Sequence, residues 1–279
     1  QEFLPDRLRC TGEFARQVEQ QLYENFQNQE LFDDDRVTPD WFGVNYDTFF
    51  RLFDIQIHVQ HTEMGGHESV GHHFVSVVED LEDDYDKLKP TAFGVDKEST
   101  RAKFESISQT IGDILPVRMK MDCLYSVPTQ MVVHFMSMEN MMFNMYDYPE
   151  LFKEMMDRIA EDTLAYYRML EKEHLILPTV SYEGVGQGTW AFTNELPGYD
   201  EIGKRTFTPK DVWGFMDSQE TVGISPQMYE EFVFPCYKKI SEQYGLLSYG
   251  CCEPVHPIWD SCISKLKNLR KVSISPWCD

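Results

Sequence analysis

The chain has little positive charge for its length. Across 279 residues, 25 lysines and arginines stand against 47 aspartates and glutamates, which leaves a formal charge of −22. Because a surface this acidic repels the phosphates of nucleic acids and of anionic lipids, we expect neither nucleic acid nor membrane as a partner. Apolar runs are also short, and none approaches the roughly 18 residues that a membrane-spanning helix needs.

The sequence also lacks the features of a secreted protein. It has no positively charged start followed by an apolar stretch, the pattern of a secretory signal. Its seven cysteines are odd in number, and Cys251 and Cys252 are adjacent, so they do not resemble a disulfide framework. We therefore expect a cytoplasmic protein with free thiols. Because the chain begins at Gln1 rather than Met and ends just after an apolar run, we also expect terminal segments to be missing.

What the sequence does contain is an alternation of strand-like and helix-like segments. Helical spacing predicts helices over residues 12–28, 97–111, 128–146, 149–174, 225–244 and 257–268. Apolar or alternating runs predict strands over residues 41–44, 55–61, 114–121, 175–181, 211–216, 246–249 and 271–277. Such alternation is typical of a parallel sheet, and a TIM-type (β/α)8 barrel needs about 250 residues.

We therefore predict an α/β fold. A TIM-type barrel domain, incomplete at its C-terminus, would occupy residues 41–279. An N-terminal helical extension with some β structure would precede it, over residues 1–40.

Residue types that bind metals gather near the end of the chain. Cys251, Cys252, Glu253 and His256 follow one predicted strand, and Cys278 follows the next. Thiolate, imidazole and carboxylate are the ligands that zinc prefers. The sequence therefore predicts a zinc site with Cys251 and Cys278 as ligands and with Glu253 or His256 as the third. The alternative is that the two adjacent cysteines are small packing residues at a tight turn.

Carboxylates also follow predicted strands. Asp217 and Glu220 come after the strand over 211–216, where a barrel places groups for general acid–base work or substrate binding. Gln219 lies between them, and Asp122 and Glu183 follow two other predicted strands. We predict Asp217 and Glu220 as catalytic and the other three as substrate-binding residues. For Asp217, capping of a local turn is the alternative.

Several stretches resemble a known family. The run Ile224–Ile240, which reads ISPQMYEEFVFPCYKKI, resembles the helix after an active-site strand in the uroporphyrinogen decarboxylase superfamily. Val127-Pro128-Thr129 and the strand leading into Tyr249–Cys251 match the same pattern, and the resemblance covers about residues 113–279. It is nearest to the corrinoid- and zinc-dependent methyltransferase branch. There the strand typically ends His-x-Cys-Gly, whereas this chain has Tyr249, Cys251 and Cys252 at the three named positions.

The resemblance implies a TIM-barrel enzyme that moves a methyl group between a small methylated substrate and a corrinoid protein or thiol. Zinc would act as the Lewis acid, and Tyr249 joins the predicted catalytic residues because it stands at the histidine position. The implied partners are a small-molecule methyl donor and a corrinoid carrier protein docked on the acidic surface, and a homodimer is compatible with the sequence. A decarboxylase or lyase acting through Asp217 and Glu220, or a non-catalytic barrel that binds a small molecule or tetrapyrrole, are the alternatives.

Overall fold

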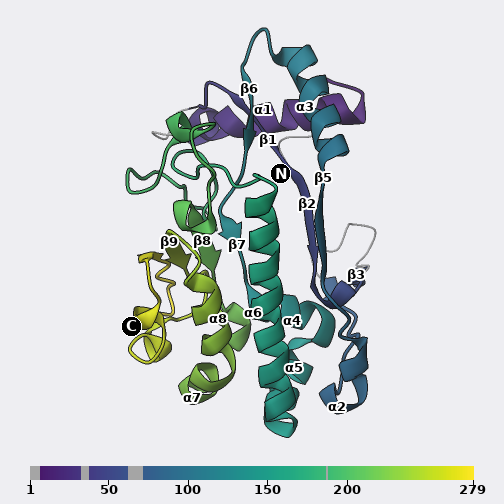
Figure 1. Ribbon diagram of the computed structural model, residues 1–279, viewed down its shortest axis with the longest axis vertical. Coiled ribbons are helices and arrows are strands. Elements are labelled where there is room, and N and C mark those ends of the chain that lie inside the picture. Colours follow the sequence, from purple (N-terminus) through teal and green to yellow (C-terminus); the bar gives the residue numbers. More distant parts are fainter. Residues whose placement is uncertain (1–6, 33–37, 62–71, 187) are drawn as a thin grey trace. The chain divides into compact units, whose positions relative to one another are not determined.

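The computed structural model describes residues 7–32, 38–61, 72–186 and 188–279. The chain divides into two units (Figure 1): Gln1–Asp47 with Asp96–Lys120, and Thr48–Val95 with Met121–Asp279. The predicted N-terminal extension over residues 1–40 lies within the first unit, which also takes in two later stretches of chain. The domain boundary at residue 40 stays a prediction.

In its described residues, the first unit has two helices and a pair of parallel strands. Its elements are α1 (Glu13–Phe32), β1 (Phe42–Asn45), α3 (Lys97–Ile111) and β6 (Val117–Lys120). Strand β1 pairs with β6, with Phe42 opposite Val117. A small core forms between the helices and the strands, built on Val18, Phe42, Val44 and Ile107. Asp96 caps α3, because its side chain accepts a hydrogen bond from the backbone N–H of Ser99 at 2.8 Å.

The second unit contains the parallel sheet that the sequence predicts. Strands β7 (Leu124–Tyr125), β8 (Trp213–Met216), β9 (Leu246–Tyr249) and β10 (Leu269–Val272) lie in the order β10-β9-β8-β7. All three neighbouring pairs are parallel. Every residue of β8 and β9 is buried, as expected for central parallel strands covered on both faces.

Helices pack beside this sheet (Figure 1). They are α4 (Pro128–Met136), α5 (Met138–Asp147), α6 (Pro149–Lys172), α7 (Pro226–Met228) and α8 (Phe234–Ser241). A π-helical turn, Tyr229–Val233, joins α7 to α8. This turn widens the helix just before Pro235, which has no N–H to donate and would clash with the preceding turn of a regular α-helix.

The rest of the second unit is made of short elements. Strands β2 (Asp47–Arg51) and β5 (Ala92–Asp96) form one two-stranded sheet, and β3 (Val59–His61) pairs antiparallel with β4 (His72–Phe74). The helix α2 (Leu81–Asp84) follows. Single 3-10 turns are Leu52–Asp54, Tyr85–Lys87, Tyr199–Glu201, Pro209–Asp211, Gln219–Thr221, His256–Ile258 and Ile263–Lys265.

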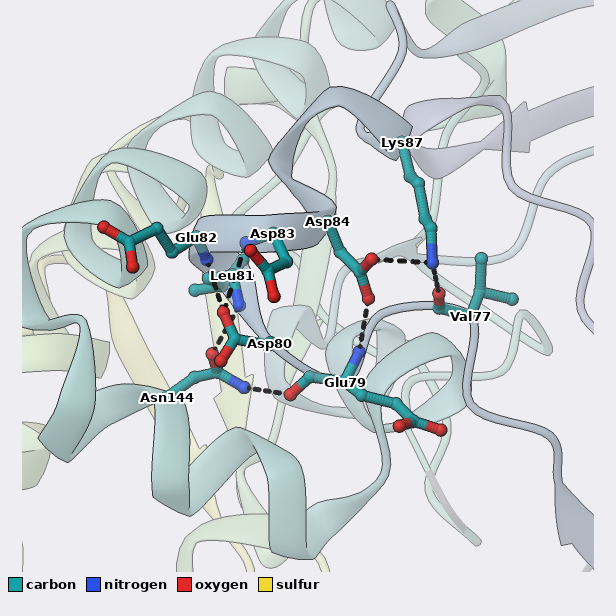
Figure 2. Close-up of polar contacts among 9 residues, drawn as sticks. All are labelled: Val77, Glu79, Asp80, Leu81, Glu82, Asp83, Asp84, Lys87 and Asn144. Atoms are coloured by element: carbon teal, nitrogen blue, oxygen red, sulfur yellow. Dashed lines mark hydrogen bonds and ion pairs between the residues drawn. The ribbon is translucent and has the colours of Figure 1, made fainter.

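Asn144 of α5 fixes the acidic segment around α2 (Figure 2). Its side-chain oxygen accepts the Leu81 N–H at 2.7 Å, and its side-chain nitrogen donates to the Glu79 carbonyl at 2.8 Å. The Asp80 carboxylate caps α2 by accepting the backbone N–H groups of Glu82 and Asp83. One buried amide thus satisfies backbone groups of a segment more than sixty residues earlier in the chain.

The structure confirms the α/β class and corrects several predicted elements. Among the described residues the largest sheet has four strands, so a closed eight-stranded barrel is not shown. Residues 175–181, all of them described, form no strand, and 257–268 contains 3-10 turns instead of a helix. The helix predicted over 128–146 is two helices, because Ser137 adopts a φ of 69° between them. No helix in the described parts of the chain is long and apolar enough to cross a membrane.

Candidate active site

The candidate site lies at the C-terminal edge of the parallel sheet. Met216 pairs with Tyr249 at the ends of β8 and β9, and the Gly250 N–H donates to the Met216 carbonyl at 2.9 Å. The segments that follow both strands therefore start from the same edge of the sheet. In open parallel sheets, ligands bind outside the carboxyl ends of the strands.

Asp217 is the most unusual group at this edge. Its side chain is fully buried, and neither carboxyl oxygen accepts a hydrogen bond of normal geometry, although the nearby backbone N–H of Gln219 partly offsets the rise in its pKa. Burial, and then the charges of Glu253 and Glu220, raise the pKa of Asp217 from 3.8 to about 7. Since buried polar groups are nearly always hydrogen-bonded, an unpartnered carboxyl group requires an explanation, and a proton held for chemistry is one.

Two hydroxyl groups connect the Glu220 carboxyl group to the backbone carbonyl of Asp217. Glu220 Oε2 lies 2.9 Å from Thr129 Oγ1, which lies 2.8 Å from the Tyr237 hydroxyl. That hydroxyl donates to the backbone carbonyl of Asp217 at 2.7 Å. The Thr129 hydroxyl donates to Glu220, so these contacts fix the Glu220 carboxyl group relative to the backbone of Asp217.

Glu253 has a different environment from the other two carboxyl groups. Its Oε1 accepts the Ser218 N–H at 3.0 Å, and its Oε2 accepts the Cys251 N–H at 2.9 Å. Glu253 thereby ties the loop after β8 to the loop after β9.

The hydroxyl group of Tyr249 contacts the loop that follows β8. Its hydroxyl lies 2.6 Å from Ser218 Oγ and 2.8 Å from the hydroxyl of Tyr229, and all three side chains are buried. Burial keeps the pKa of Tyr249 well above its usual 10. Tyr249 is thus a neutral group that positions the Ser218 loop, and its predicted catalytic role stays a prediction.

A cleft with a volume of about 560 Å³ lies beside these residues. Three of the predicted site residues line it: Gln219, Glu220 and Glu253. Met138, Cys252 and Trp277 also line it, so the walls are largely apolar with carboxyl groups at one side. No lysine, arginine or histidine is among the described residues of the lining. The cleft therefore suits a small molecule that is neutral or positively charged.

The predicted zinc ligands are placed separately. Cys251 Sγ lies 3.4 Å from Cys252 Sγ, and burial is the largest cause that raises the pKa of Cys251 to about 12. His256 is exposed, with its Nε2 3.5 Å from Asp279 Oδ2. Hydrogen bonds from the backbone, that of Val255 first, lower the pKa of Cys278.

Within the described parts of the chain, no three such side chains are arranged to hold one metal ion. Both oxygens of Glu253 already accept backbone N–H groups. The arrangement therefore does not fit a preformed zinc site, and zinc stays a prediction.

Asp122 and Glu183, predicted to bind substrate, do not line the cleft. Asp122 Oδ1 accepts the Gly184 N–H at 3.1 Å. Glu183 is fully buried, and it accepts the Ser181 N–H at 2.7 Å and the hydroxyl hydrogen of Tyr199. In the structure both carboxylates hold the loop that follows residues 175–181. Their predicted role in substrate binding stays a prediction.

Sequence reasoning missed the two residues that complete the hydrogen-bond chain. Thr129 is the second residue of α4, and Tyr237 lies in α8. Both belong to the stretches that resemble the decarboxylase superfamily, and that resemblance was the only signal for them. Nothing in their spacing indicates that helices so far apart in the chain meet beside Asp217.

Comparisons with known proteins add little. No protein-family model matches the chain, and no curated protein matches it. A solved structure, a methyltransferase from Methanosarcina mazei, is 13% identical with a TM-score of 0.41. The match covers 91% of this chain and 63% of that one, so this chain spans less than two thirds of the other protein.

Proposed function

We propose that the chain is an enzyme that transfers a methyl group, with Asp217 and Glu220 handling the proton. The observation that carries the proposal is the buried carboxyl group of Asp217, which lies close to two carboxyl groups that line the cleft, Glu220 and Glu253. A group with a pKa near 7 is protonated in about half of the molecules at neutral pH, which is where a general acid works best.

Glu220 is the acid that would touch the substrate, because it lines the cleft and Asp217 does not. In the proposed reaction, a nucleophile attacks the methyl carbon of a bound methyl ether or alcohol, and the carbon–oxygen bond breaks. Glu220 gives its proton to the departing oxygen, Asp217 returns a proton to Glu220 through a water molecule, and Asp217 regains its own proton from solvent. The products are a methylated acceptor and an alcohol or water.

The acceptor in this proposal is a thiolate or the reduced cobalt of a corrinoid, carried by a partner protein. A neutral methyl donor matches the lining of the cleft, which offers apolar walls and no cation to an anionic substrate. Bound zinc would supply a Lewis acid for the same oxygen. The proposed proton and methyl transfers do not depend on zinc, because no three of the described candidate ligands are arranged to hold one metal ion.

A decarboxylase or lyase is the second candidate, favoured by the same pair of carboxyl groups. There Glu220 would protonate the carbanion left as carbon dioxide departs. The lining weighs against it, because no lysine or arginine among the described lining residues could pair with a substrate carboxylate.

The test is a methyl-transfer assay with the full chain. Cob(I)alamin is incubated with methanol or a methyl aryl ether, and methylcobalamin is followed by its absorbance. We expect methylcobalamin with the wild type and a loss of about 10²–10⁴-fold in Glu220→Gln, the usual contribution of a general acid. Release of carbon dioxide from a carboxylated substrate without methyl transfer would instead establish the decarboxylase. Ligand binding with neither product would identify a non-catalytic barrel.

A further inference from the structure

The side chains of Cys251 and Cys252 form a close pair at the edge of the cleft. Their sulfur atoms are 3.4 Å apart. Cys252 is exposed and lines the cleft, whereas Cys251 is half-buried. We propose that this pair is an oxidation site, at which a hydroperoxide joins the two sulfurs in a disulfide and a thiol reopens it.

The chemistry takes two electrons from the pair. Cys252, the exposed thiol, meets the oxidant first: its sulfur attacks one peroxide oxygen, the oxygen–oxygen bond breaks, and a sulfenic acid and one molecule of alcohol or water form. Cys251 sulfur then attacks the sulfenic sulfur, and the sulfenic hydroxide leaves with the Cys251 proton as water. Two thiols and one hydroperoxide thus yield one disulfide, with the peroxide reduced.

Closing this bond must change the backbone between the two residues. The sulfurs have to approach from 3.4 Å to about 2.05 Å. Neighbouring Cα atoms are about 3.8 Å apart across a trans peptide, which is shorter than the 4.4 Å or more that disulfides usually span, so the peptide has to twist. Strain of this kind makes a disulfide easier to reduce, which suits a reversible modification.

The peptide that must twist is held by specific contacts. Ser273 Oγ donates to the Cys251 carbonyl at 2.9 Å, and this carbonyl belongs to the Cys251–Cys252 peptide. The Cys251 N–H donates to Glu253, which also accepts from Ser218. Oxidation would therefore break or strain the Ser273 contact and loosen the link that Glu253 makes between the loops after β8 and β9. The redox state of the pair would alter the wall of the cleft.

The experiment uses the full chain, reduced with dithiothreitol and freed of it. The protein is exposed to one equivalent of hydrogen peroxide, its free thiols are alkylated, and it is digested with chymotrypsin. Cleavage after Tyr249 and Trp259 releases residues 250–259, which contain Cys251 and Cys252 and no other cysteine. We expect this peptide two hydrogens lighter and without alkyl groups, and dithiothreitol should restore both alkylation sites. A peptide that instead takes two alkyl groups, or that carries oxygen on Cys252 alone, would overturn the proposal.

Three comparisons test whether the folded structure promotes the disulfide between Cys251 and Cys252. The link should form about tenfold faster in the native chain than in urea, because the fold holds the sulfurs together. An equal or slower native rate would contradict the proposal. Ser273→Ala, which frees the carbonyl, should make the disulfide harder to reduce, and an unchanged reduction midpoint would count against the coupling to Ser273. Cys236→Ser, in buried α8, should leave the linked peptide unchanged.

Discussion

Replacing Asp217 with asparagine should make the protein more stable at neutral and alkaline pH. Asparagine resembles the protonated acid in shape and has no charge to bury. The pKa of Asp217 rises from 3.8 to about 7, a change of about 3 units, and each unit corresponds to about 1.4 kcal/mol. Above pH 7 the ionised aspartate therefore costs the folded state about 4 kcal/mol, an upper value because water can enter the site.

The pH dependence has a definite sign. Below pH 3.8 the carboxyl group is protonated in both the folded and the unfolded chain, so it contributes no pH dependence. Between about pH 4 and pH 7 the folded state holds the proton more tightly, so its free energy of unfolding falls as the pH rises. The wild type should lose this stability over that window, and Asp217→Asn should not. The charge of Asp217 interacts with Glu220, Glu253, Cys251 and Tyr125, and Asp217→Asn removes these interactions.

The assay is urea denaturation of both proteins between pH 4 and pH 9. Subtracting the two curves removes every group whose titration they share. We expect a difference that is small near pH 4 and grows to between about 2 and 4 kcal/mol at pH 8. A difference that stays constant across this range would refute the raised pKa and the proton store built on it. The variant should also lose methyl transfer, so that stability and activity change in opposite directions.

Three further predictions follow from contacts in the second unit. Thr129→Val, which breaks the chain between Glu220 and Tyr237, should lower methyl transfer while Thr129→Ser restores it, as turnover assays would show. Asn144→Ala should cost about 1–3 kcal/mol in urea denaturation by leaving the Leu81 N–H unpaired. Gly214→Ala should destabilise by about 1–3 kcal/mol or more in the same assay, because its Cβ would lie 2.1 Å from buried Tyr244.

The sequence predicted the strands of the parallel sheet better than it predicted how many strands would pair. Strand β9 has the predicted bounds, and β8 lies inside its predicted range, because short apolar runs between turns are a local signal. Residues 175–181 are as apolar as a strand and mostly buried, yet they pair with no neighbour. Their contact with the sheet runs through a side chain instead: Thr179 Oγ1 accepts the Trp213 N–H at 2.8 Å. Periodicity reports burial and does not specify pairing.

The site could be predicted only as far as chain position allows. Asp217 and Glu220 follow a strand, and of the two only Glu220 lines the cleft. The sequence could not show whether the Asp217 carboxyl group has a hydrogen-bond partner, because that depends on where the donors of all the neighbouring segments lie. The sequence also could not show that both carboxyl oxygens of Glu253 accept backbone N–H groups and are therefore not free to bind a metal ion.

The proposed proton transfer depends most on the proton that Asp217 holds near neutral pH. The direct measurement is a carbon-13 NMR titration of the aspartate side-chain carboxyl groups, with the Asp217 signal assigned by its absence from Asp217→Asn. We expect that signal to titrate with a midpoint near pH 7, well above the usual 3.8. A midpoint near pH 4 would mean that Asp217 is ionised at neutral pH, and it would contradict the proposed acid.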